Sequence, residues 1–272
     1  MDERLKTNLD CWNEMARVHL DSPNYRVNDF REGKTHLTRL EREEVGDVQD
    51  KSLLHLQCHF GLDTMSWARL GARATGLDFS DQAIDLARSL SSELKIPAKF
   101  VCSNLYDAPN VLADKFDVVF TSHGVLCWLP DLKGWARVAA HFVKPGGFFY
   151  IAEFHPMTQI IDNGGGMAHV GQAKELKVEF SYFSRVMREF PPGPDYSDSS
   201  VMLSHSSHEW MYTTAGVVTA LIETGLVIEF LHEHPVCCFQ MFPFMEKGPD
   251  GWWRIKGDPL PLTLSIKARK PG

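Results

Sequence analysis

The sequence lacks several features that mark other classes of protein. Its 272 residues hold no apolar run long enough to span a membrane, and the charged start, Met1–Lys6, lacks the apolar stretch of a secretion signal. Lys and Arg together number 28 against 35 Asp and Glu, which leaves a formal charge of -7 and no basic run for neutralising phosphates. The composition therefore predicts a cytoplasmic protein that acts on neither nucleic acid nor a membrane.

Cysteine is also scarce, and it is not arranged for metal binding. The six cysteines include no C-x-x-C pair, and we expect reduced thiols, several of them in apolar strand-like segments. Histidines at alternate strand positions simply share one face of a sheet, and no acidic or cysteine partner stands at ligand spacing. We therefore predict no metal site at the three pairs that invite one: His205/His208, His232/His234 and Cys237/Cys238.

The most informative pattern is a strand, a loop, a helix and a second strand between residues 52 and 80. An apolar run, Leu53–Leu56, enters the loop Gln57–Gly61, and an amphipathic segment then leads to a second apolar strand that ends at Asp78. Nucleotide-binding α/β folds place an acidic residue at this position, about twenty residues beyond the loop, where it accepts hydrogen bonds from both ribose hydroxyls. The pattern predicts a ligand that contains adenosine.

Helix and strand patterns alternate along most of the remaining chain. Two closing strands are joined by a loop without a helix, which predicts an antiparallel hairpin at a sheet edge. Helices are predicted over 8–18, 35–45, 63–70, 81–94, 132–143 and 214–224, and further strands over 99–102, 116–121, 148–154, 226–239 and 262–268.

The alternation lapses between residues 157 and 213. Loop chemistry dominates at Gly164–Gly166, Pro191–Pro194 and Ser197–Ser200, while Leu176–Val186 has the β-branched and aromatic content of a strand. The segment leaves the sheet after its fifth strand, at the carboxyl edge where ligands bind. We predict an inserted substrate lid, not a second catalytic domain or a docking module.

This order of elements resembles the class I S-adenosylmethionine-dependent methyltransferase family of the small-molecule type, over nearly the whole chain. The resemblance implies one α/β domain, 1–272: a doubly wound seven-stranded sheet, mostly parallel with the last strand antiparallel, helices on both faces and an inserted lid. Within it, residues 1–48 would cover the cofactor site, 49–156 would bind the cofactor, 157–213 would form the lid, and 214–272 would add the last helix and hairpin. The matching segments are Leu54–Gly61, Gly76–Ser80, Ser103–Leu105, Phe116–Val119 and Lys144–Gly147.

The first loop departs from the family pattern of leucine, aspartate, leucine, glycine, cysteine, glycine, x, glycine. His55, Gln57 and His59 replace the aspartate and two of the glycines, so only Gly61 keeps the freedom of a residue without Cβ. Backbone approach to a ligand is still possible if the loop adopts ordinary dihedral angles. Gln57 or His59 could add hydrogen bonds to the amine or carboxylate of the methionine part; the alternative is a loop too crowded for a ligand.

The resemblance and the strand ends together assign cofactor contacts. Asp78 is expected to bind the ribose, and the amide oxygen of Asn104 or the backbone of Leu105 the adenine. Trp12 and Tyr25 would close over the cofactor, although amphipathic packing explains them equally well. The full predicted set is Trp12, Tyr25, Gln57, Cys58, His59, Gly61, Asp78, Phe79, Ser103, Asn104, Leu105, Ser122 and His123.

Three residues are candidate catalytic groups. His123 follows the fourth strand, and Glu153 and His155 end the fifth, where each could position a substrate or remove a proton. Structural roles for Glu153 and His155 remain open alternatives.

The predicted reaction is methyl transfer from S-adenosyl-L-methionine to an O, N or C nucleophile of a small molecule, leaving S-adenosyl-L-homocysteine. The protein is expected to work as a monomer or homodimer. One alternative is an inert S-adenosylmethionine-binding or interaction protein. A nicotinamide-dependent oxidoreductase is a second, but it would normally show G-x-G-x-x-G where this chain has one glycine.

Overall fold

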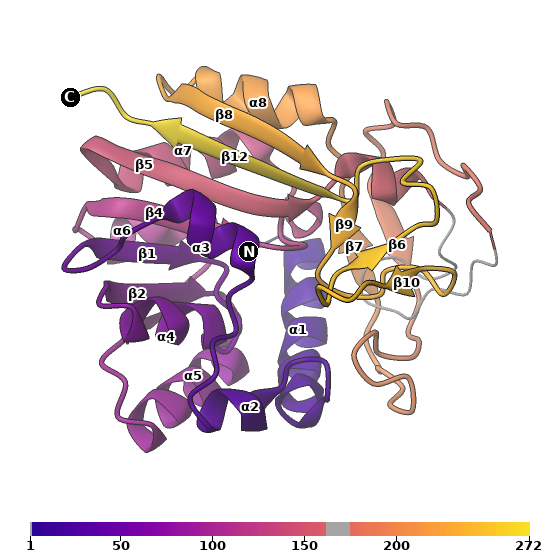
Figure 1. Ribbon diagram of the computed structural model, residues 1–272, viewed down its shortest axis with the longest axis horizontal. Helices are drawn as coiled ribbons and strands as arrows, with labels where there is room; N and C mark the ends of the chain where they lie inside the picture. Colours follow the sequence, from indigo (N-terminus) through magenta and orange to yellow (C-terminus); the bar gives the residue numbers. More distant parts are fainter. Residues whose placement is uncertain (1, 162–174) are drawn as a thin grey trace.

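A seven-stranded sheet forms the centre of the molecule (Figure 1). The computed structural model of the chain describes residues 2–161 and 175–272. Strand β12 runs antiparallel to both neighbours and the other strands run parallel to one another, which confirms the predicted sheet and its closing hairpin. In spatial order the strands are β3 (Lys99–Cys102), β2 (Arg73–Asp78), β1 (Ser52–Leu56), β4 (Phe116–Ser122), β5 (Val143–Phe154), β12 (Thr263–Arg269) and β8 (Val227–His234).

Several helices begin at polar capping residues, as their sequence predicts. Ser80 caps α5 by accepting a hydrogen bond from the Ala83 amide at 3.0 Å. Thr38 and Glu41 form a capping box, so the helix predicted from residue 35 begins only at Arg39. The helices are α1 (Glu3–Asp21), α2 (Val27–Arg31), α3 (Arg39–Val45), α4 (Leu62–Arg69), α5 (Asp81–Glu93), α6 (Ala108–Val111), α7 (Leu132–Phe142) and α8 (Thr214–Ile222), with short 3₁₀ turns η1 (Leu105–Asp107), η2 (Leu126–Trp128) and η3 (Pro156–Ile160).

Successive residues of a strand point to opposite sides of the sheet, and in the central strands the residues on both sides are buried against helices. Leu53 belongs to the apolar cluster around Trp67 of α4, whereas its neighbour Leu54 belongs to the cluster around Trp135 of α7. Both tryptophans are fully buried. The strands are thus held between two layers of helices, and their carboxyl ends are fixed relative to one another.

The inserted segment has different strands from those predicted. Strand β6 (Arg188–Phe190) pairs with β7 (Ser207–Glu209), whereas residues 176–186 make a single bridge through Val178 and form no strand, so that prediction is wrong. Val178 and Phe183 are 64% and 80% exposed, and strand propensity without a partner edge does not produce a strand. The predicted turn at Gly164–Gly166 lies outside the described residues.

The aromatic loop between the closing strands also gains structure. It forms a small antiparallel sheet in the order β10, β11, β9, which the sequence did not predict. The three strands are β9 (Val236–Cys237), β10 (Glu246–Lys247) and β11 (Trp253–Arg254). In the view of Figure 1, helix α1 lies between this small sheet and strands β1 and β2 of the main sheet.

Helix α1 is fastened to the inserted segment. The buried Asn8 side chain donates to the His208 carbonyl at 2.8 Å and accepts from the His208 amide at 2.7 Å. Glu14 accepts from the amide of Ser204 near the same place. The N-terminal helix and the insertion therefore form one wall over the carboxyl ends of the strands.

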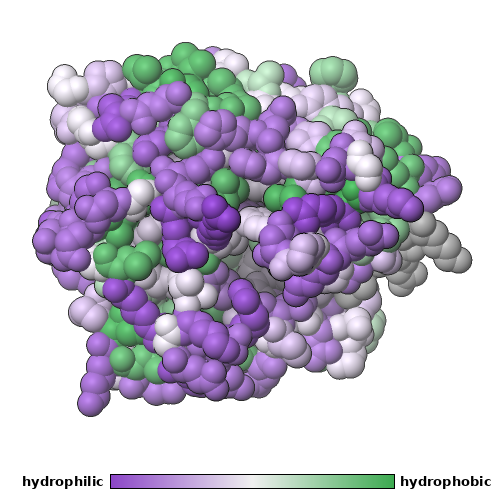
Figure 2. All heavy atoms as spheres, viewed as in Figure 1, coloured by the Kyte–Doolittle hydropathy of each residue, from purple (hydrophilic) through white to green (hydrophobic). Residues whose placement is uncertain are grey.

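The surface in Figure 2 is mostly hydrophilic, with apolar residues gathered along the upper edge near α8 and β8. Across the described residues, the helices are too short or too polar for any of them to span a membrane. The six cysteines are free, as expected.

Gly61, at the start of α4, is the single glycine of the first loop, and its position tolerates no side chain. Its φ is +79° and an added Cβ would lie 2.5 Å from the Phe100 ring. Gly61→Ala should therefore lose about 2–4 kcal/mol of stability, through left-handed strain and overpacking. Gly225, just past the end of α8, has a φ of +84° with nothing within 4 Å of an added Cβ, so Gly225→Ala should cost only about 1 kcal/mol. Urea unfolding measures both, and equal losses would contradict the packing role.

Candidate functional site

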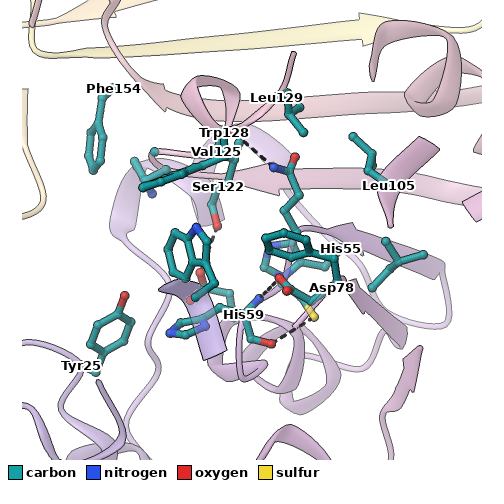
Figure 3. Close-up of a pocket in the computed structure, with 18 of the residues that line it drawn as sticks. Tyr25, His55, His59, Asp78, Leu105, Ser122, Val125, Trp128, Leu129 and Phe154 are labelled. Carbon is teal, nitrogen blue, oxygen red and sulfur yellow. Dashed lines mark hydrogen bonds between the residues drawn. The ribbon is translucent and has the colours of Figure 1, made fainter. Parts of the chain in front are cut away.

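A cavity of about 280 Å³ opens at the carboxyl ends of β1, β2 and β4. Its walls come from four parts of the chain: the N-terminal helices, the strand ends, the inserted segment through Tyr196, and the closing loop through Phe239. In Figure 3, Tyr25 and Phe154 stand on one side of the space, and Asp78 and Leu105 on the other. This is where parallel α/β sheets bind ligands.

The first loop keeps a left-handed backbone although its glycines are missing. Gln57 and His59 have φ of 57° and 51°, so the loop does not have the ordinary dihedral angles under which backbone approach was expected to be possible. Each such residue costs about 1 kcal/mol of strain, which the surrounding contacts must offset. The Gln57 side chain donates to the Val125 carbonyl at 3.1 Å, and the Cys58 amide to the Leu77 carbonyl at 3.0 Å. These contacts hold the loop in a conformation that glycine would adopt without strain, and Gln57, Cys58 and His59 line the cavity.

Asp78 ends β2 and faces the cavity. Its carboxylate accepts a hydrogen bond from the His59 amide at 2.8 Å (Figure 3) and another from the Ser80 amide at 2.9 Å. Burial raises the pKa of this carboxyl to about 6, against the opposing effect of those amides. Two backbone donors occupy part of the carboxylate's capacity, and the remaining lone pairs are available to a ligand.

The segment after β3 forms the far end of the cavity. Ser103, Asn104 and Leu105 all line it, next to Phe79. The Asn104 side-chain oxygen already accepts from the Tyr106 amide at 2.9 Å, because Asn104 caps η1. Of the residues predicted to contact the cofactor, Gly61 alone does not line the cavity. Its backbone packs closely against the Phe100 ring instead.

A polar cluster that sequence reasoning missed lies at the other end. Asp63 is paired with His36 at 2.6 Å and accepts from the Ser122 hydroxyl at 3.1 Å. Burial favours the neutral acid, but His36 and its hydrogen bond hold the pKa of Asp63 well below the usual range. His55 meets Thr64 at 2.9 Å nearby, and burial lowers its pKa to about 4.

Glu41 and His123 form the second half of this cluster. One Glu41 oxygen accepts from the Thr38 amide at 2.7 Å, while the other lies 3.6 Å from His123 Nδ1. Burial, together with the charge of Asp63, raises the pKa of Glu41 to about 8. His123 Nε2 has no hydrogen-bond partner within the described chain, and both residues line the cavity. In the sequence, Glu41 indicates only a helix cap, so its position in the cavity wall was not predicted.

Glu153 and His155 have structural positions, which favours the structural alternative to their predicted catalytic roles. Neither lines the cavity. The Glu153 carboxylate accepts from the amides of Gly124, Val125 and Leu126 and so holds the loop after β4. His155 caps η3 and pairs with Glu233 at 2.8 Å.

Trp12 and Tyr25 both lie over the cavity. The indole of Trp12 packs edge-on against Trp128 with ring centroids 5.1 Å apart. The Tyr25 hydroxyl is hydrogen-bonded to the Tyr196 hydroxyl of the inserted segment. Ring packing and cavity lining therefore coexist at these residues.

One histidine pair has an acidic neighbour that the sequence hid. Glu44 of α3 meets His232 at 2.7 Å and His234 at 3.9 Å, so the stated lack of an acidic partner is wrong. Glu44 is distant in sequence, and only the fold brings α3 beside β8. Its other oxygen accepts from the Tyr150 hydroxyl at 2.8 Å. The expectation that no metal binds stays a prediction.

Comparison with known proteins agrees with this architecture. Residues 54–151 match the family described as a methyltransferase domain. The ubiquinone biosynthesis O-methyltransferase of Serratia proteamaculans is 29% identical over 117 residues, or 43% of this chain and 48% of that protein. The Escherichia coli protein of the same name is 31% identical over 125 residues, or 46% and 49%. The chain thus spans about half the length of these curated relatives.

Solved structures resemble the chain over a larger part. An S-adenosylmethionine-dependent methyltransferase from Mesorhizobium loti has a TM-score of 0.60 at 20% identity, covering 85% of this chain and 96% of that one. The glycopeptide N-methyltransferase MtfA in complex with S-adenosylmethionine has a TM-score of 0.56 at 15% identity, covering 86% and 92%. The protein has the class I methyltransferase fold, and its residues 54–151 match a methyltransferase domain.

The raised pKa of Glu41 predicts how stability depends on pH. The carboxyl has a pKa of about 8 in the folded protein against an ordinary 4.5, so folding retains a proton that the unfolded chain releases. That stabilisation is complete below the unfolded pKa, falls by about 1.4 kcal/mol per pH unit above it, and is lost above the folded pKa. Glu41→Gln should therefore gain stability relative to the wild type between about pH 5 and 8 and then level off.

Urea unfolding over this pH range tests the trend. Glu43→Gln, at an exposed position on the same helix, controls for the loss of a surface charge. A Glu41→Gln difference that stays constant with pH would show that the carboxyl ionises normally.

Proposed function

We propose that the protein binds S-adenosyl-L-methionine in this cavity and transfers its methyl group to a small molecule. The observation that carries the proposal is Asp78: a buried carboxylate at the end of β2, hydrogen-bonded to the first loop and facing the cavity. A carboxylate in this position suits the two adjacent hydroxyls of a ribose. The methyltransferase-domain match over 54–151 supports the same ligand.

The cofactor would extend from Leu105 to the polar end of the cavity. Adenine would lie beside Phe79 and Leu105, with Asn104 offering its remaining lone pair. Arg26 lines the opposite side, and its guanidinium suits the carboxylate of the methionine part. Sequence reasoning missed Arg26, because it stands in a loop whose contact with the cavity only the fold creates.

His123 is the proposed base. S-adenosylmethionine supplies an electrophilic methyl group, so the protein must hold an acceptor in line and remove its proton. His123 Nε2, which has no hydrogen-bond partner in the described chain, would accept that proton, and the ionised Asp63 of the same cluster would stabilise the imidazolium formed. The reaction names of the curated relatives favour an oxygen acceptor.

The inserted segment is proposed to be a lid over the acceptor. Tyr196 reaches the cavity and is hydrogen-bonded to Tyr25, and Phe239 of the closing loop packs between Tyr196 and Phe154. These aromatic walls would exclude water from the transferring methyl group and suit an acceptor with an apolar body.

Removal of the Asp78 carboxylate tests cofactor binding. Asp78→Ala should weaken S-adenosylhomocysteine by about 1.5–3 kcal/mol for each hydrogen bond lost, because the acceptor is charged. Wild-type affinity should also fall below about pH 6, where the free protein protonates Asp78. Titration calorimetry measures both effects, with the exposed neighbour Asp81→Ala as control. An unchanged dissociation constant for Asp78→Ala would place the ribose elsewhere.

Replacement of His123 tests the chemical step. A panel of small hydroxyl-bearing aromatic compounds, with formation of S-adenosylhomocysteine as the signal, identifies a usable acceptor. On that acceptor His123→Asn should lower kcat by about 10²–10⁴-fold while cofactor affinity is retained. Full turnover by His123→Asn would exclude it as the base, and no turnover of any compound by the wild type would favour an inert binding protein.

A further inference from the structure

Three side chains, two of them buried, form a hydrogen-bonded chain from the inserted segment to the first loop. Asp195 Oδ2 lies 3.1 Å from His19 Nε2, and His19 Nδ1 lies 2.9 Å from His59 Nε2. Asp195 and His19 are fully buried. The two residues stand 176 positions apart in sequence, and the chain ends at one of the positions where a family glycine is replaced.

The direction of each hydrogen bond follows from charge. Asp195 Oδ1 accepts from the Ser197 amide, the Ser197 hydroxyl and the Asp198 amide at 2.6–3.0 Å, an arrangement that favours the carboxylate. Although burial opposes ionisation, the bonds from His19 and Ser197 hold the pKa of Asp195 below its usual value. Asp195 therefore accepts, and His19 Nε2 carries the hydrogen.

The same reasoning fixes the far end of the chain. Burial lowers the pKa of His19 and lowers that of His59 still further, so both rings are neutral. A neutral His19 that donates from Nε2 must accept at Nδ1, and His59 must then donate from Nε2. His59 Nδ1 is left with a lone pair and has no hydrogen-bond partner in the described chain.

We propose that His59 Nδ1 is the acceptor subsite for the primary ammonium group of the cofactor's methionine part, with Asp195 and His19 holding it in the accepting tautomer. This rests on the proposed function. His59 lines the cavity directly after Cys58, beside Asp78, which is where the methionine part would leave the ribose. Arg26 across the cavity would take the carboxylate, so the two ends of the amino acid have separate partners.

The opposite arrangement makes the opposite prediction. If His19 were an imidazolium paired with Asp195, it would donate to His59 Nε2, and His59 Nδ1 would carry a hydrogen. His59 would then bind the carboxylate instead of the ammonium. The two cases differ in a proton that can be observed.

Histidine ¹⁵N NMR of the ligand-free protein distinguishes the tautomers. The proposal requires His59 to be protonated at Nε2 and bare at Nδ1, and a hydrogen at Nδ1 would overturn it. Asp195→Asn should disturb this tautomer, whereas Asp198→Asn should not. The two aspartates are matched, because each accepts from a serine amide and hydroxyl two residues on, but only Asp195 meets a histidine.

Binding of three probes then tests the ligand group: S-adenosylhomocysteine, its analogue without the amino group, and its analogue without the carboxylate. His59→Asn retains a residue type that tolerates the left-handed backbone. It should weaken the two amine-bearing ligands by about tenfold to a hundredfold and leave the deaminated analogue unchanged.

The outcomes distinguish failure of the ammonium subsite from failure of the proposed function. Equal weakening of all three ligands by His59→Asn would mean that His59 acts only through loop structure, and a loss that follows the carboxylate would assign the opposite subsite. Either result overturns the ammonium subsite while leaving the proposed function standing. Failure of the wild-type protein to bind any of the three would overturn the proposed function itself.

Discussion

The hydrogen bond from the His59 amide to the Asp78 carboxylate is the contact on which the site depends. It joins the end of β2 to the first loop, in which Gln57 and His59 hold left-handed backbone angles that their side chains disfavour. Parallel pairing of β1 with β2 brings the two ends together and supplies the rigidity that holds this strain. Burial raises the pKa of Asp78 to about 6 against the effect of this bond, and the remaining lone pairs of the carboxylate can accept from a ligand.

The remaining walls are built by segments that are distant in sequence. Helix α1 is clamped to the inserted segment through Asn8, and Tyr25 meets Tyr196 across the cavity. Asp195 reaches the first loop through His19. Movement of the insertion would therefore disturb both the Tyr25–Tyr196 contact over the cavity and the hydrogen bond between His19 and His59. Closure of the proposed lid would then be coupled to the loop that would hold the cofactor.

Local patterns predicted the sheet and Asp78 because strand alternation, helix caps and the end of β2 are properties of short segments. Glu41 and Arg26 were not predicted, since only tertiary packing brings them to the cavity. Glu153 was named as a catalytic candidate for a related reason. Its position at a strand end can be predicted from the sequence, but the cluster of backbone amides around it cannot. The left-handed angles at Gln57 ran against residue propensity and were imposed by the fold.

The central claim is that a loop without its usual glycines still forms a cofactor site against Asp78. A crystal structure of the protein with S-adenosylhomocysteine tests it most directly. The account predicts ribose hydroxyls on the Asp78 carboxylate, adenine beside Phe79 and Leu105, and a backbone at Gln57 and His59 that remains left-handed with the ligand bound. A ribose bound away from Asp78, or a first loop that must rearrange to other dihedral angles to admit the ligand, would contradict it.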